Sequence, residues 1–271
     1  MGQSRLMLAI RRPILRGLPT LLAISLSAAS GRWCRAEAWA DWRVAGPFVC
    51  RADFPLDGYE GLFDDLAQLQ HDLVRYLGVP PAQAPIELYL FQDQGSYRRF
   101  LSQNLPDVPY RRALYVQKDG HGMVFAYRGR QLPVDIRHEC THALLHATLP
   151  MVPLWLDEGL AEYFEVAPSE RAFGSPHLSG VRWSARLGLL PRLGKLENKG
   201  DLSEMGGSEY RHAWAWAHFM LHGPTQAHDE LVRFLADIQA QTPPGLLSRR
   251  LKHRLPDLDH RFSGHFRSWK P

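Results

Sequence analysis

Cysteine is scarce in this chain, with three among 271 residues. So few cysteines exclude a disulfide-rich scaffold, and the fold must depend on an apolar core. Hydrophobic residues make up 45% of the sequence and charged residues 22%, which are ordinary values for a folded protein. Cys50 and Cys140 would be able to pair in an oxidising compartment, but their spacing does not demand it. We expect two buried free thiols.

A charge excess of either sign is also missing after the N-terminal segment. The whole chain has a formal net charge of +4, but residues 1–40 alone carry +5, which leaves −1 for the remainder. The basic balance therefore belongs to this segment and gives no indication of nucleic-acid binding. The charges counted in the segment are Arg5, Arg11, Arg12, Arg16, Arg32 and Arg35 against Glu37.

The N-terminal segment is typical of an export leader. A basic stretch without acids, 1–16, precedes an apolar run of about twelve residues, 18–29, which suits a signal peptide and is short for a membrane span. Small-residue cleavage sites follow at 27–29, 36–38 and 38–40, and the sequence does not choose among them. Arg11-Arg12 resembles the start of a twin-arginine signal. We therefore expect a periplasmic or secreted protein, tethered to the membrane only if the leader stays uncleaved.

The remaining sequence, 41–271, has no internal repeat and no low-complexity tract, and we expect it to form one domain. Hydrophobic periodicity predicts strands first and helices afterwards, so the fold class is α+β, with a strand-rich half over 41–130 and a helical half over 131–271. The predicted strands span 42–52 with a turn at Gly46-Pro47, 86–91, 113–117 and 122–127. The predicted helices span 58–77, 94–104, 133–148, 154–166, 208–221 and 230–240.

The run His138-Glu139-Cys140-Thr141-His142 lies in one of these helices. Histidines four residues apart share one helix face, as two ligands of a single zinc ion must. Glu139 would stand beside the metal without binding it, where its carboxylate can accept a proton from water and pass it to a leaving group. The alternative is a surface helix rich in His and Glu. The apolar flanking residues disfavour it, because they predict a buried helix in which polar groups need partners.

The next predicted helix, Trp155-Leu156-Asp157-Glu158-Gly159-Leu160-Ala161-Glu162-Tyr163-Phe164, supplies acidic candidates for a third ligand. Together with the first motif it resembles the gluzincin metallopeptidases, the thermolysin and aminopeptidase N group, and above all their small peptidase-MA-like relatives. The resemblance covers roughly 42–166. It implies a zincin-like fold, one Zn²⁺ per chain, a peptide or protein substrate, and Glu158 as the third metal ligand.

The spacing departs from that family. Fifteen residues separate His142 from Glu158, slightly fewer than in thermolysin, and by count alone Glu162 fits better. The local Asp-Glu-Gly sequence favours Glu158. Glu162, one turn later, would then hold a ligand histidine by its other ring nitrogen. Asp157 is expected to cap the helix or to bond locally.

The resemblance also implies a tyrosine or histidine donor for the oxyanion on a later helix, for which we choose Tyr210, with His212 behind it. The alternative for Tyr210 is a core aromatic. It further implies that the strand 122–127 pairs with an extended substrate, against the alternative of a plain edge strand. His218 and His222 are interpreted as helix-face residues. The other histidines outside the motif are expected to be mostly exposed: His71, His121, His146, His177, His228, His253, His260 and His265.

The sequence therefore predicts an exported zinc-dependent hydrolase, most concretely a metallopeptidase. Two alternatives remain at this point: hydrolysis of a cell-wall amide by the same site, and a binding protein that keeps the metal site without catalysis. We expect no nucleic-acid partner and no stable membrane insertion once the leader is removed. The sequence leaves the substrate and the oligomeric state open.

Overall fold

The computed structural model describes residues 7–9 and 39–270. The predicted leader and its cleavage sites therefore lie outside the described residues, apart from 7–9 and the two residues before 41. The strands are β1 (Met7–Ala9), β2 (Asp41–Ala45), β3 (Phe48–Ala52), β4 (Ile86–Phe91), β5 (Ala113–Lys118) and β6 (His121–Tyr127). The helices are α1 (Glu60–Leu77), α2 (Gln94–Asn104), α3 (Leu132–Thr148), α4 (Leu154–Phe164), α5 (Leu178–Arg186), α6 (Leu193–Glu197), the 3-10 helix η1 (Leu202–Glu204), α7 (Gly207–His222), α8 (Thr225–Gln239), α9 (Leu247–Arg254) and α10 (Leu258–Ser268).

The strands form one mixed sheet in the order β1-β5-β6-β4-β3-β2. Two hairpins, β2–β3 and β5–β6, are antiparallel, whereas β3–β4 and β4–β6 are parallel. Tight turns close the hairpins: Gly46 has φ +55°, and Asp119 and Gly120 have φ +51° and +83°. Two consecutive residues with positive φ suit a two-residue hairpin turn, because their twist matches that of the strands.

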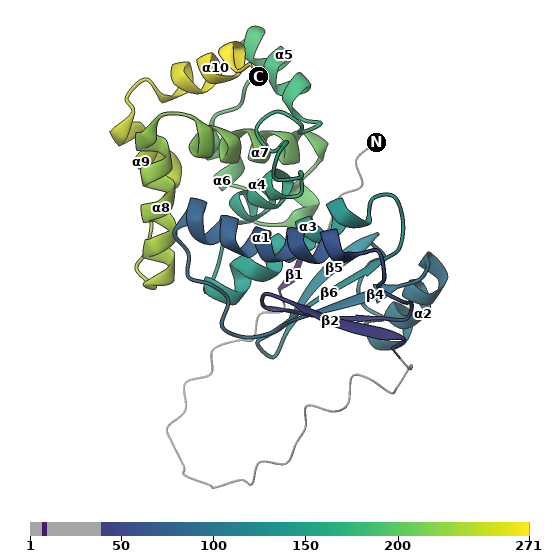
Figure 1. Cartoon of the computed structure of the whole chain (residues 1–271). Coiled ribbons are helices and arrows are strands. Elements are labelled where there is room, and N and C mark those ends of the chain that lie inside the picture. Colours follow the sequence, from purple (N-terminus) through teal and green to yellow (C-terminus); the bar gives the residue numbers. More distant parts are fainter. Residues whose placement is uncertain (1–6, 10–38, 271) are drawn as a thin grey trace, which may run out of the picture.

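Successive side chains of a strand point to opposite faces of the sheet, and each face packs against different helices. On one face, Cys50, Leu88 and Val124 belong to a core that also contains residues of α1 and α3. On the other, Tyr89 and Phe125 pack with Phe100 of α2. Figure 1 shows α1 and α3 lying across the sheet and the later helices gathered beyond them. The helix α3 therefore lies between the sheet and the helical half.

The strand β6 lies inside the sheet, with β5 on one side and β4 on the other. The expectation that strand 122–127 pairs with an extended substrate is therefore wrong, since its backbone groups already bond to two neighbours. The hairpin itself was predicted correctly. The sequence did not indicate that β4 pairs with β6 on the side away from β5.

The second half of the fold is almost entirely helical. Residues 149–153 connect α3 to α4, and Pro153 precedes the first turn of α4. Helix α4 then packs very closely on α7: a Cβ at Gly159 would lie 2.5 Å from the carbonyl oxygen of Ala213. Trp216 of α7 stacks on Phe262 of α10 with ring centroids 3.7 Å apart. These contacts hold α4, and with it the acidic motif, against α7, and α7 against α10.

The predicted α+β class and the order of strands before helices are confirmed. Helix 94–104 has the predicted bounds, whereas α8 begins at Thr225, five residues before the predicted start at Glu230. Cys50 and Cys140 are buried free thiols, and burial raises the pKa of the Cys50 thiol to about 12. Over the described ranges, no helix combines the length and the apolar composition that a membrane crossing requires.

Candidate metal centre

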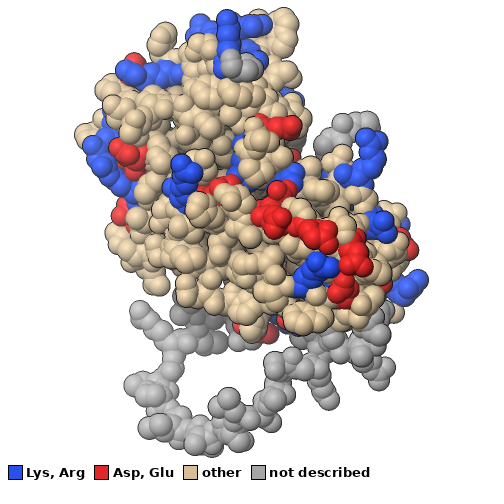
Figure 2. All heavy atoms as spheres, viewed as in Figure 1, with Lys and Arg blue, Asp and Glu red and all other residues tan. Residues whose placement is uncertain are grey.

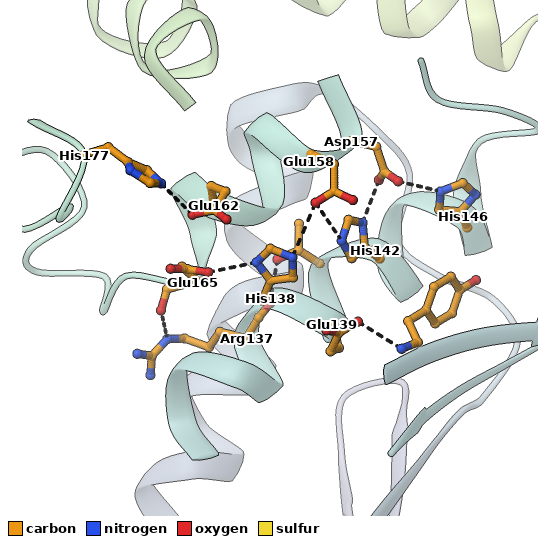
Figure 3. Close-up of polar contacts among 12 residues, drawn as sticks. Arg137, His138, Glu139, His142, His146, Asp157, Glu158, Glu162, Glu165 and His177 are labelled. Carbon is orange, nitrogen blue, oxygen red and sulfur yellow. Dashed lines mark hydrogen bonds and ion pairs between the residues drawn. The ribbon is translucent and has the colours of Figure 1, made fainter. Parts of the chain in front are cut away.

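Three side chains from two helices converge in the core between α3 and α4. His138 and His142 come from α3 and Glu158 from α4, and their ligand atoms all lie within 4.8 Å of one another. Oε2 of Glu158 is 3.7 Å from Nε2 of His138 and 3.8 Å from Nε2 of His142. All three side chains are buried. The structure thus brings together the two histidines of the first motif and the predicted third ligand (Figure 3).

The carboxylate of Glu158 shows that this cluster suits a cation. The residue is fully buried, and neither of its oxygens has a hydrogen-bond partner among the described residues. Burial raises the pKa of Glu158 well above its usual value, despite the opposing effect of nearby His142. A buried carboxylate without hydrogen bonds is costly. Two imidazoles and one carboxylate are the donor set of many catalytic zinc sites, so these residues fit a zinc ion.

Each histidine is oriented through its other ring nitrogen. Nδ1 of His138 lies 2.8 Å from Oε2 of Glu165, and Nδ1 of His142 lies 3.0 Å from Oδ1 of Asp157. A carboxylate at this nitrogen fixes the ring and directs Nε2 towards the metal position. Nε2 of both imidazoles therefore faces Glu158.

Glu162 does not have the role that the sequence suggested. Its Oε2 lies 2.9 Å from Nε2 of His177, while Glu165 and Asp157 hold the two expected ligands. The prediction that Glu162 orients a ligand histidine is corrected on this ground. The reason is the rotation of α4: Glu158 faces both ligand histidines, whereas Glu162 lies where the segment carrying His177 approaches. Glu162 also belongs to a second possible ligand group with His138 and Glu165, in which His138 already contacts Glu165 through Nδ1.

Asp157 is a buried bridge between two histidines, and not a local cap. Its Oδ2 lies 3.1 Å from Nε2 of His146, while Oδ1 contacts His142. Burial by itself would raise the pKa of Asp157, but the two histidines lower it well below its usual value. For His142 both effects have the opposite sign. Burial alone would lower its pKa, but the negative charge of Asp157 outweighs burial and raises the pKa of His142 to about 10. His146 was expected to be exposed and is instead part of the site.

Glu165 is itself fixed by a buried arginine. Arg137 donates from Nε to the backbone oxygen of Glu165 at 2.7 Å and from Nη1 to Asp65 at 2.8 Å. Arg137 directly precedes the first metal-ligand candidate on α3, and Asp65 lies on α1. The chain of contacts therefore ties α1, α3 and the end of α4 together around His138. Figure 3 shows the part that joins Arg137, Glu165 and His138.

Glu139 lies on the side of the site that faces the sheet. Its Oε2 accepts a hydrogen bond of 2.9 Å from the backbone N–H of Tyr115 on β5. The Tyr115 ring lies over His142 and His146, with centroids 6.5 Å and 5.9 Å away. No sequence pattern indicates a role for Tyr115, because the contact depends on how β5 lies against α3.

Tyr210, the predicted oxyanion donor, is a buried residue of α7 near the site. Burial is the main cause that raises the pKa of Tyr210, and the charges of Glu158 and Glu162 raise that pKa further. His212 differs: burial and the charge of Arg211 lower its pKa. Of the two residues, Tyr210 is the one whose electrostatic neighbours are the carboxylates of the site. Its hydroxyl therefore remains the candidate donor.

The fold and the site define an α+β protein with a buried His-His-Glu centre. No protein-family model matches this chain, and no curated protein does. Among solved structures, the crystal structure of the M1 zinc metallopeptidase from Deinococcus radiodurans is similar, with 16% sequence identity and a TM-score of 0.45. The similarity covers 86% of this chain and 52% of that chain, so the present chain spans about half of its length. A likeness of this degree does not establish a common family or activity.

Proposed function

We propose that this protein is a zinc-dependent hydrolase, and specifically a metallopeptidase. The observation that supports a metal is the convergence of His138, His142 and Glu158, in which the buried Glu158 carboxylate accepts no hydrogen bond from any described residue. A cation of charge +2 bound there would supply the missing partner for that carboxylate.

Zinc bound at this centre would polarise a carbonyl group and lower the pKa of a water molecule. The two imidazoles would bind through Nε2, because Glu165 and Asp157 engage their Nδ1 atoms. Glu158 would complete three protein ligands, which leaves a fourth position for water or substrate. This is the arrangement of a catalytic zinc site, since structural sites use four protein ligands.

Glu139 is the proposed general base. It follows His138 on α3 and its carboxylate is held from the β5 side by the Tyr115 N–H. There it takes a proton from the attacking water and gives it to the leaving amine. Tyr210, on α7, would donate a hydrogen bond from its hydroxyl to the developing oxyanion. The five proposed residues thus divide metal binding, proton transfer and charge stabilisation among α3, α4 and α7.

Metal analysis and hydrolysis assays test this proposal together. The purified protein should retain about one zinc per chain and cleave members of a peptide library. Glu139→Gln should keep the zinc and lose turnover by at least about a thousandfold, because the amide cannot accept the proton. Glu170→Gln makes the same change at an exposed residue and should leave both properties unchanged.

Several outcomes would contradict the proposal. Undiminished hydrolysis by Glu139→Gln would exclude the proposed base, and absence of zinc from protein refolded with zinc would exclude the centre. Cleavage of purified cell wall without cleavage of any peptide would favour the alternative amide hydrolase.

Export is part of the same proposal, because the leader rests on the sequence of residues 1–40 alone. Expression of the full chain in a bacterium and mass spectrometry of the product should show cleavage after one of the three small-residue sites. An unprocessed chain retained in the cytoplasm would contradict export without affecting the proposed chemistry.

A further inference from the structure

Three large apolar side chains lie exposed within seven residues at the end of α5. Trp183, Leu187 and Leu189 are 63%, 62% and 67% exposed. Isolated exposed leucines are common on soluble proteins, but a contiguous group that includes tryptophan indicates a surface that binds something. The metal centre does not involve these residues, so the proposed activity leaves them unexplained.

Helix geometry places this group opposite the core. Leu178, Val181 and Ala185 form the buried face of α5. At about 100° per residue, Trp183 and Leu187 project from the other side of the helix, roughly 180° away. The helix therefore has two apolar faces, of which only the inner one is satisfied by packing within the chain.

Hydrogen bonds hold the exposed group in place after the helix ends. The N–H of Leu187 bonds to Trp183 O at 3.1 Å, and the N–H of Leu189 bonds back to Ser184 O at 2.8 Å. Gly188 between them has φ +68°, which favours glycine and folds the chain back. The hydrogen bond from Leu189 to Ser184 therefore holds Leu189 beside the last turn of α5. We call Trp183, Leu187 and Leu189 the apolar tip.

The segment that carries the apolar tip contains basic residues and no acids. No Asp or Glu occurs from Arg171 to Leu196. Arg182 and Arg186 flank Trp183 and Leu187 on the helix, and Arg186 is exposed. Arg192 follows the tip, where its side chain contacts Asp259 at 3.2 Å. In Figure 2, Lys and Arg side chains gather at the end of the molecule where α5 and the end of α10 lie in Figure 1.

We propose that the apolar tip and its arginines dock onto the surface of a bilayer that contains anionic phospholipid. Tryptophan and leucine enter the boundary between headgroups and acyl chains, while arginines beside them attract lipid phosphates. A second copy of this chain fits less well, because a symmetric contact would place one basic surface against another. The chain would adsorb through this tip without spanning the bilayer, and the inference stands independently of the metal site.

Vesicle sedimentation tests the proposal on the full chain. Wild-type protein should bind vesicles of phosphatidylglycerol and phosphatidylcholine, bind phosphatidylcholine alone more weakly, and be released by salt. The triple variant Trp183→Ala/Leu187→Ala/Leu189→Ala should lose at least about tenfold in partitioning. Trp42→Ala/Val44→Ala removes two similarly exposed apolar side chains from β2 and should bind as the wild type does.

The charge component has its own variant, which leaves the apolar tip intact. Arg186→Glu should reduce binding to the anionic vesicles by about tenfold and leave binding to phosphatidylcholine unchanged. Arg99→Glu makes the same change at an exposed position of α2 and should have a much smaller effect on vesicle binding. Because these substitutions are at exposed positions, thermal melts should be close to that of the wild type.

Hydrogen exchange locates the contact and separates it from binding through the N-terminal segment. Anionic vesicles should slow exchange in peptides that cover 183–190. Equal vesicle binding by wild type and the triple variant, or no protection over 183–190, would overturn the proposal. Self-association that the triple variant abolishes, without vesicle binding by the wild type, would replace it with an interface between copies.

Discussion

Oε2 of Glu165 lies 2.8 Å from Nδ1 of His138, on the side of the ring opposite the metal position. Glu165 is the cap residue that follows α4, seven residues after the third ligand candidate. The contact explains why both ends of α4 matter to the centre: Asp157 holds His142 near its start, and Glu165 holds His138 at its end. One helix therefore supplies a metal ligand and both orienting carboxylates.

Removal of either orienting carboxylate should weaken zinc binding. We expect Glu165→Gln and Asp157→Asn each to lower zinc affinity by about 10- to 100-fold, since a neutral amide attracts and orients the imidazole less strongly than a carboxylate does. Competition with a chromophoric chelator measures this affinity. Glu162→Gln is the control, because Glu162 contacts His177. An equal loss of zinc affinity in Glu162→Gln would indicate that Glu162 does orient a ligand histidine.

The close contact of α4 and α7 predicts a large effect of one methyl group. Gly159→Ala would place a Cβ 2.5 Å from Ala213 O, so the helices must separate. We expect a loss of roughly 2–4 kcal/mol in the free energy of unfolding, at the upper end of overpacking effects. Gly61→Ala on α1, where a Cβ meets nothing within 4 Å, should be neutral or slightly stabilising. Urea unfolding of both variants tests the difference.

Buried histidines should make the fold sensitive to acid. His218 contacts His265 through Nδ1 and Ala172 O through Nε2, both at 3.1 Å. Burial lowers the pKa of His218 to about 3 and that of His265 to about 4. The other rings around His218 belong to His222, Tyr163, Trp269, Trp214 and Phe266, and none of them supplies a negative charge to a protonated imidazole.

The sign of the pH effect follows from these values. Below about pH 6.5 the unfolded chain binds protons on both histidines, whereas the folded chain does not until about pH 4. Stability present at neutral pH should therefore decrease as the pH falls, by roughly 2 kcal/mol for each histidine at pH 5. His265→Phe should reduce the change in urea midpoint between pH 7 and pH 5. His253→Phe, at an exposed position, should leave it as in the wild type.

Tyr210→Phe separates charge stabilisation from metal binding. Loss of the hydroxyl should lower kcat by about 10²- to 10³-fold, as removal of an oxyanion donor does elsewhere, and should leave zinc content unchanged. Steady-state kinetics on a cleaved peptide gives kcat and KM separately. Tyr76→Phe, at a half-buried tyrosine that packs against the apolar core, is the matched change. Full activity of Tyr210→Phe would exclude Tyr210 as the oxyanion donor and favour the alternative, in which Tyr210 is a core aromatic residue.

Local periodicity was enough to predict much of this protein. The strands β2 to β6, the β5–β6 hairpin and the helices that carry both motifs follow from patterns of two and of 3.6 residues, because such patterns depend on neighbours along the chain. The same period places His138 and His142 on one face of α3. The choice of Glu158 came from its motif and its resemblance to a known family, since counting residues favoured Glu162.

Only the tertiary structure decided which carboxylate does what. Glu158 and Glu162 are one helical turn apart, so the sequence places both on the same side of α4. The packing of α4 against both α3 and α7 brings Glu158 to the histidines and leaves Glu162 with His177. The Tyr115 N–H that holds Glu139, the interior position of β6 and the partial burial of His146 likewise arise from contacts between distant segments, which no local pattern encodes.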